Sequence, residues 1–178
     1  MHNQIDKKAQ IWIETVIYTL IAFALIATVL AFVKPKIDEM QDKAIIEQTI
    51  SMMKDVDSTV SEIVQGGSGN KRKIEVGINK GTLSIDGEND LILFEIDSEY
   101  VYSEPGKEIE NGNLLVKTEE VGGVNKITIK RNYTNYNITF SGKDEMKSLS
   151  KASTPYTIFV TNNGKGDDEK WEVDFEIS

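Results

Sequence analysis

The sequence predicts an α+β protein, in which a long N-terminal hydrophobic and then amphipathic helix precedes an antiparallel, β-rich, sandwich-like domain. An almost wholly apolar run is followed by apolar residues at helical spacing, and the rest of the chain alternates short strand-like runs with turn residues. The divisions we expect are a cleavable leader at residues 1–9, a membrane helix at 10–33, its amphipathic continuation at 34–65, a glycine-rich linker at 66–70 and a β domain at 71–178.

Composition excludes several classes of function. The 178 residues carry 20 Lys and Arg against 29 Asp and Glu, a net charge of −9, which argues against a nucleic-acid partner. The chain has no cysteine and a single histidine, His2, so thiolate sites, histidine triads and multi-histidine metal sites are excluded. It has no P-loop, GxSxG or HExxH motif either. We therefore expect no catalysis, no cofactor and no metal site.

The apolar run spans residues 11–33 and contains one ionisable residue, Glu14. As a helix it would measure about 35 Å, enough to cross a hydrocarbon core of about 30 Å. An ordinary secretory signal peptide is the alternative, but the run is too long and lacks a small-x-small cleavage site near its end. We therefore expect a single-pass membrane helix. The Lys34-Pro35-Lys36 sequence that follows is expected to break or kink the helix.

The residues before this run form a short basic leader. Lys7 and Lys8 precede Ala9, and the apolar run starts just after Gln10, with Glu14 four positions further on. In these features the sequence resembles the type IV pilin superfamily, most closely its archaeal members with class III signal peptides. The resemblance implies cleavage after Ala9 by a prepilin-type signal peptidase, then assembly with copies of itself or other pilin-like subunits on an assembly platform. Archaellins usually begin with glycine-rich sequence, which is missing here, so the closer resemblance is to pilins.

Glu14 is the residue to which the resemblance gives a role. A carboxylate in a membrane span costs about 2–3 kcal/mol near the centre and less near an end, so it usually marks function. The resemblance implies that Glu14 neutralises the N-terminal amine on Gln10 of a neighbouring subunit and so fixes the axial register of a filament. The alternative is that Glu14 reaches lipid headgroups. Ala24, Ala27 and Ala31 would permit close helix packing, although alanine is common in any membrane helix.

Residues 34–65 show helical periodicity and should end before a Gly66-Gly67-Ser68-Gly69 breaker. Charged residues, Asp42 among them, fill the opposite face. The apolar stripe could pack on the β domain of the same chain, or it could form a coiled seam with other copies. It comprises Ile37, Met40, Ala44, Ile46, Ile50, Met53, Val56 (or Asp57), Val60 and Ile63.

About nine short strands at spacings near ten residues predict a sandwich or a curled sheet. Turn signals such as Asn111-Gly112 and Gly122-Gly123 separate them. Residues 143–154 show little pattern and could be a loop or a short helix. The strands are expected at 73–78, 82–86, 91–97, 100–103, 114–118, 126–130, 136–140, 156–161 and 171–177.

Two N-x-[ST] sequons make Asn132 and Asn137 candidate glycosylation sites, although Asn137 lies in a strand-like run. Acidic stretches at 86–90 and 167–169 could offer oxygen ligands to calcium, but neither has EF-hand spacing, and ordinary turns explain both.

We therefore expect a structural subunit of a type IV pilus-like surface filament or pseudopilus. Its localisation would be the cell membrane, single-pass in lipid with the C-terminal domain outside the cytoplasm, and then the surface filament. The alternative is a single-pass, membrane-anchored β domain for binding or adhesion that does not polymerise. A third reading is an accessory subunit of a surface motor or secretion machine.

Overall fold

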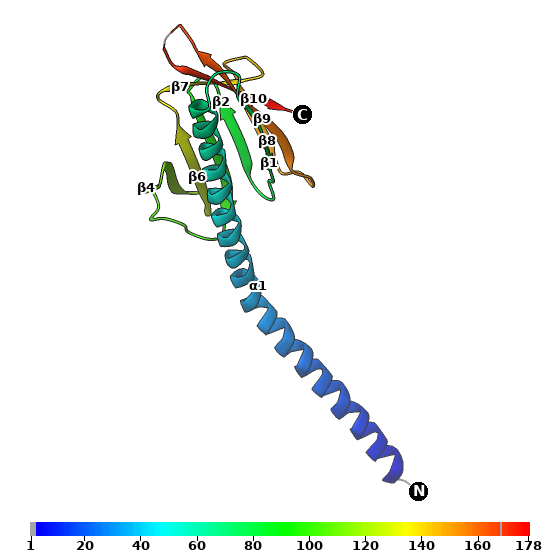
Figure 1. Ribbon diagram of the computed structural model, residues 1–178. Coiled ribbons are helices and arrows are strands. Elements are labelled where there is room, and N and C mark those ends of the chain that lie inside the picture. The colour runs from blue at the N-terminus through cyan, green and yellow to red at the C-terminus, as the bar shows by residue number, and fades with distance from the viewer. Residues whose placement is uncertain (1–2, 168) are drawn as a thin grey trace. The chain divides into compact units, whose positions relative to one another are not determined.

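The computed structural model describes residues 3–167 and 169–178, with side chains from Gln10 onward. In these residues one long helix, α1 (Asn3–Gln65), precedes a β-rich region of two sheets, so the chain has the expected α+β fold (Figure 1). The chain divides into two compact units, one ending at Met40 and the other Gln41–Ser178.

All ten strands belong to the second unit. They are β1 (Lys71–Val76), β2 (Thr82–Asp86), β3 (Leu91–Ser98), β4 (Glu108–Asn111), β5 (Leu114–Val121), β6 (Val124–Asn132), β7 (Tyr136–Phe140), β8 (Met146–Ser150), β9 (Tyr156–Lys165) and β10 (Trp171–Ile177).

The strands form a four-stranded sheet in the order β1-β9-β10-β7 and a six-stranded sheet in the order β4-β5-β6-β3-β2-β8. Neighbours pair antiparallel, except that β10 and β7 are parallel. The tight β5–β6 hairpin turns at Gly122 and Gly123, whose φ angles are 64° and 83°. Positive φ at both central residues is what a type I′ hairpin turn requires, and glycine adopts it without strain.

The expected strands at 82–86, 136–140 and 171–177 have the observed bounds. The strand expected at 100–103 is wrong, because these residues lie outside any strand. The Ser98 hydroxyl accepts a hydrogen bond from the Tyr100 backbone N–H and donates one to the Tyr100 carbonyl, which turns the chain out of the ladder.

Two strands were not expected from the sequence. Residues 146–150 form β8 rather than a loop or a short helix, and β4 was missed entirely. Both lie at an edge of the six-stranded sheet. In β8 only Leu149 is buried, and in β4 no residue is. An edge strand with two polar faces shows no alternation that a sequence pattern could reveal.

The hydrophobic core of the second unit lies between α1 and the sheets. One face of the helix contributes to the same buried cluster as the strands, which confirms that this stripe packs on its own domain and leaves it unavailable for a coiled seam. Three residues expected on the same stripe are instead exposed: Ile37 and Met40, at 46% and 71% in the first unit, and Ala44. The buried helix residues are Ile46, Ile50, Met53, Val56, Val60 and Ile63.

Of the break or kink expected at Lys34-Pro35-Lys36, the break is wrong, since Pro35 lies inside α1, and the kink stays a prediction. Proline has no N–H to donate to the carbonyl four residues earlier, so one helical hydrogen bond is lost there. Side chains of the neighbouring lysines pair within the helix: Lys34 lies 3.8 Å from Asp38, and Lys36 lies 2.5 Å from Glu39. Pairs at this spacing stabilise a helix by a few tenths of a kcal/mol each.

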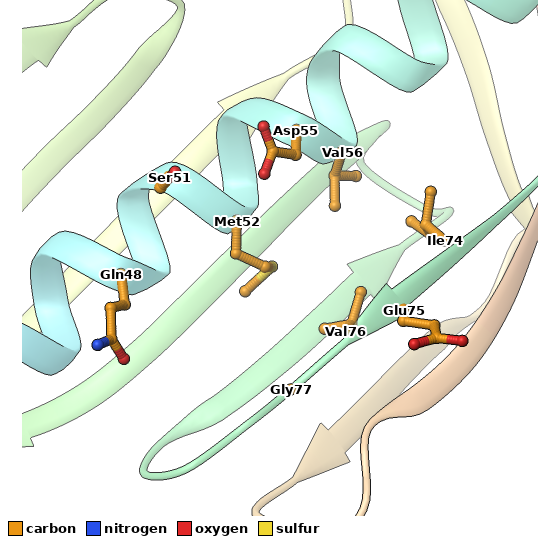
Figure 2. A pocket seen from close by; sticks show the side chains of 9 residues that line it. All are labelled: Gln48, Ser51, Met52, Asp55, Val56, Ile74, Glu75, Val76 and Gly77. Atoms are coloured by element: carbon orange, nitrogen blue, oxygen red, sulfur yellow. The ribbon is translucent and has the colours of Figure 1, made fainter.

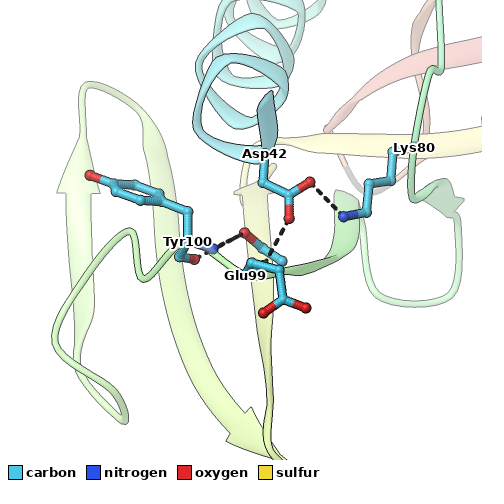
Figure 3. A network of polar contacts seen from close by, with 5 residues as sticks. Asp42, Lys80, Glu99 and Tyr100 are labelled. Carbon is cyan, nitrogen blue, oxygen red and sulfur yellow. Dashed lines mark hydrogen bonds and ion pairs between the residues drawn. The ribbon is translucent and has the colours of Figure 1, made fainter. Parts of the chain in front are cut away.

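Asp42 is not on a solvated helix face as the sequence suggested, because it is only 5% exposed. Its carboxylate accepts a hydrogen bond from Lys80 Nζ at 2.6 Å and from the Glu99 backbone N–H at 2.7 Å (Figure 3). A buried carboxylate needs such partners to offset its lost hydration. Asp42 therefore joins the helix to the loop that precedes β2 and to the turn that follows β3.

Asp57 forms a second buried polar contact between α1 and this sheet. Its carboxylate accepts hydrogen bonds from Arg131 Nε at 2.6 Å and from Asn113 Nδ2 at 2.9 Å. The Arg131 guanidinium lies 4.8 Å from the centre of the Tyr133 ring. Tyr133 is 2% exposed, and its hydroxyl makes no hydrogen bond within the described part of the chain. The Arg131 charge is thus enclosed by a carboxylate and a ring face.

Removing the Asp57 carboxylate should destabilise the domain more than removing an exposed one from the same helix. In Asp57→Ala, the Arg131 side chain, 23% exposed, loses its carboxylate partner, and we expect a loss of about 3 kcal/mol of unfolding free energy. Glu62→Ala is the control, because Glu62 also pairs with an arginine, Arg72, but both side chains are about half exposed. Its cost should stay below about 1 kcal/mol. Urea unfolding of the detergent-solubilised chain measures both, and equal losses would contradict the role of Asp57.

The Tyr133 hydroxyl gives a second prediction. Burial, and next the Asp57 carboxylate, raise the pKa of the Tyr133 phenol well above its usual value. The unfolded-state pKa of this phenol is about 10, so its contribution to stability is fully present below that pH and is lost as the pH rises further. The unfolding free energy of Tyr133→Phe should therefore fall less steeply than that of the parent above about pH 10. At neutral pH it should be as stable as the parent or up to about 1 kcal/mol more stable.

Tyr133→Ala provides the comparison, because it removes the ring and should cost about 3–5 kcal/mol. Unfolding free energies measured from neutral pH to above pH 10 test both variants. If Tyr133→Phe were strongly destabilised at neutral pH, the hydroxyl would have a partner after all.

Candidate functional site: the apolar segment of the long helix

The surface with the clearest functional meaning is the apolar part of α1. Within the described residues one helix, Gln10–Gln65, is long and apolar enough to cross a membrane, and none of its most apolar window is buried. Aromatic and aliphatic side chains are exposed all around it; Trp12 and Phe32, for example, are 70% and 76% exposed. An apolar surface of this size is not stable in water, so it must be covered by lipid or by other protein.

The three threonine hydroxyls within this segment are bonded to the backbone of the same helix. The hydroxyls of Thr15, Thr19 and Thr28 each donate a hydrogen bond to the backbone carbonyl four residues earlier, at 2.8–2.9 Å. A hydroxyl bonded in this way presents only its methyl group and a lone pair to the surroundings. These threonines are therefore compatible with an apolar environment.

Glu14 is the one carboxylate between Gln10 and Val33, and its Oε1 accepts a hydrogen bond from Gln10 Nε2 at 3.2 Å. The two residues lie one helical turn apart, as their spacing predicts. The bond is exposed, so the carboxylate has unfilled acceptor positions. Glu14 is therefore available to a cationic partner.

The alanines expected to pack helices, Ala24, Ala27 and Ala31, are all exposed in the first unit. Their three- and four-residue spacing places them on one face of the helix. Lys7, Lys8 and Ala9 lie in the helical backbone, but their side chains lie outside the described ones.

The two sequons lie in different settings. Asn132 is the last residue of β6 and is exposed, and Thr134 two residues later is also exposed, although Tyr133 between them is buried. Asn137 is half buried inside β7, where it pairs with Glu172 of β10. A modifying enzyme needs an accessible, flexible acceptor, so Asn132 is the better candidate of the two.

In the acidic stretch at 86–90, the carboxylates of Asp86 and Asp90 accept hydrogen bonds from other groups of the same chain. Asp86 accepts hydrogen bonds from the backbone N–H and the side-chain amide of Asn89, at 3.1 and 2.8 Å. Asp90 accepts bonds from the backbone N–H of Ile138 and from Lys170 Nζ, at 2.9 and 2.8 Å. Among the described side chains, no group of three or more acidic, histidine or cysteine residues is placed to hold a metal ion.

Sequence reasoning did not find a groove of about 340 Å³ between α1 and β1. Its helix wall combines Gln48, Ser51 and Asp55, which lie off the apolar stripe, with Met52 and with Val56, which belongs to that stripe. Their spacing of three and four was visible in the sequence. No sequence signal showed that an edge strand would lie opposite them, because sheet order is set by contacts between distant segments.

Comparisons with known proteins do not identify the chain: no protein-family model, no curated protein and no solved structure matches it.

Proposed function

We propose that the chain is a structural subunit of a type IV pilus-like filament or pseudopilus. It would be inserted in the membrane as a precursor, trimmed after Ala9 and then packed through residues 10–33 into a filament core. The observation that carries the proposal is the apolar segment between Gln10 and Val33, whose apolar side chains are exposed on every side and whose one carboxylate, Glu14, lies one turn from Gln10.

Such a helix needs an apolar environment at every stage. Before assembly, lipid can cover it, because about 30 Å of hydrocarbon matches its length. After extraction from the membrane, only the same surface on other subunits can cover it all around. Exposed alanines at 24, 27 and 31 allow backbones to approach closely, and the threonine hydroxyls are already bonded. One surface can therefore serve both environments.

Glu14 would fix how far one subunit is shifted along its neighbour. Cleavage after Ala9 creates a positive α-amine on Gln10, and an amine buried in a filament core needs a carboxylate partner. Glu14 of a neighbouring subunit has acceptor positions to spare. Pairing of these two charges would favour one axial offset over all others, which is a contribution to specificity more than to net stability.

The second unit would coat the outside of the filament. A net charge of −9 keeps such a surface soluble and self-repelling. Its Asn132 would be accessible there for glycosylation. Prepilin-type signal peptidase and an assembly platform are the further partners that this function requires.

The second candidate function is a single-pass, membrane-anchored β domain that binds or adheres without polymerising. The same exposure of the apolar segment favours it, because lipid alone could cover that surface. Such a protein would keep residues 1–9, and its Glu14 would have no N-terminal amine of a neighbouring subunit to pair with.

The mature N-terminus distinguishes these functions. We expect intact-mass and N-terminal peptide spectrometry of the native membrane or filament fraction to show a chain that begins at Gln10. A chain that still begins at Met1 would contradict prepilin-type processing and leave the anchored β domain as the better account.

Glu14→Gln should separate assembly from insertion. The substitution keeps the shape and the bond to Gln10 but removes the charge that would pair with a neighbour's amine. We expect at least a tenfold loss of filaments in sheared-cell fractions, with unchanged membrane insertion and leader cleavage. Glu39→Gln is the matched control outside the apolar run and should assemble normally. A normal yield of filaments from Glu14→Gln would show that the Glu14 charge does not set the axial register of the subunits.

A further inference from the structure

The groove between α1 and β1 lies within the second unit and is independent of the apolar segment. Residues of one helix face form one wall, and the end of β1 forms the other (Figure 2). Its volume of about 340 Å³ falls at the lower end of the range for ligand-binding sites. The lining residues are Gln48, Ser51, Met52, Asp55 and Val56 on the helix, and Ile74, Glu75 and Val76 on the strand, with Gly77 just after it.

The strand wall of the groove is an unpaired sheet edge. β1 is the terminal strand of the four-stranded sheet and pairs only with β9. The Asn162 N–H bonds to the Asn70 carbonyl, and the antiparallel register alternates from there. Residues 72, 74 and 76 therefore direct their backbone groups to β9, while Lys73, Glu75 and Gly77 direct theirs to the free edge. None of these outward groups has a backbone partner among the described residues.

The floor of the groove is apolar. Met52 and Val56 of the helix point toward Ile74 and Val76 of the strand (Figure 2). Met52 and Ile74 are partly buried against the core, so an occupant could still cover part of each. Side chains on alternate positions of an added strand would reach this floor.

The rim is acidic and polar, and no basic residue lines the groove. Glu75 is already paired with Lys73, at 2.8 Å, and that ammonium lowers the pKa of the Glu75 carboxyl. Asp55 is exposed, and within the described part of the chain its carboxylate has no ion pair or hydrogen bond. Asp55 is therefore the charge that an occupant would meet, and a cation complements it.

We propose that this groove binds an extended peptide segment, which adds to the edge of β1 as a further strand, places apolar side chains on the floor and sets a basic side chain beside Asp55. Backbone hydrogen bonds to residues 73, 75 and 77 would supply affinity independent of sequence. Only every second side chain of the added strand faces the helix, so the floor and Asp55 would select apolar residues and one basic residue at these helix-facing positions.

The test uses the full chain in detergent micelles and a fluorescent nine-residue valine–lysine peptide, which has threonine at every second position, a central lysine and valine at the remaining four. Anisotropy titration should show saturable binding. The same peptide with glutamate in place of the central lysine should bind at least fivefold more weakly, because its carboxylate meets Asp55. The valine–lysine peptide N-methylated at alternate residues keeps every side chain but cannot form the ladder, and it should not bind.

Variants of the chain test the two walls separately. Asp55→Asn should weaken binding of the valine–lysine peptide about fivefold, whereas Glu110→Asn, an exposed acidic residue on β4, is the control and should leave it unchanged. Gly77→Pro removes one outward N–H and should weaken binding about tenfold. Gly77→Ala keeps that N–H and adds a methyl group in open space, so it should bind normally. Circular dichroism checks that each variant is folded.

Three outcomes would overturn the proposal. The first is no saturable binding of the valine–lysine peptide below millimolar concentration. The second is equal binding of the N-methylated peptide, which would mean that no strand is added. The third is competition by the chain itself. In that case peptide binding would be lost as the chain concentration rises, and Gly77→Pro would reduce self-association of the chain. This last result would assign the groove to a second copy.

Discussion

The fold of the second unit depends on the burial of one helix face against two sheets. Six apolar side chains between Ile46 and Ile63 are each at most 5% exposed, and they join the cluster formed by the strands. Burial of a side chain of this size is worth about 1.5–3 kcal/mol. Neither sheet has to be stable alone, because the helix supplies an apolar surface to both. The β domain is therefore incomplete without residues that the sequence places on a continuation of the apolar segment.

Two buried carboxylates determine where the helix lies on this core. Apolar contacts are not directional, so a smooth stripe could slide by one turn with little cost. Asp42 and Asp57 prevent this, because each must meet a particular cation and a particular amide donor. A one-turn shift would leave both carboxylates buried without partners. Specificity of placement thus comes from a few polar contacts, and stability comes from the apolar ones.

Sequence patterns predicted what depends on neighbours along the chain. The helical stripe from Ile46 to Ile63 and the hairpin at Gly122-Gly123 were readable because spacing and glycine content act locally. The burial of Asp42 was not, since its cation lies 38 residues away, and Arg131 lies 74 residues from Asp57. In the candidate site, too, local features could be predicted from the sequence and features that depend on distant segments could not. Exposure of the apolar segment was predictable from composition, whereas the groove beside β1 depends on which strand ends a sheet.

The sheet edges differ in how they resist unwanted pairing, and this difference gives the groove its significance. Exposed edges are commonly protected by charged side chains or by shortness. β4 has four residues, two of them glutamates, and β8 carries an exposed lysine among five residues. β1 begins with three basic residues, but its far end, from Ile74 to Val76, has two apolar side chains and one glutamate. There the helix residues that line the groove lie across from the edge strand. The part of the β1 edge that carries the fewest charges is therefore the part to which we propose that an extended segment adds.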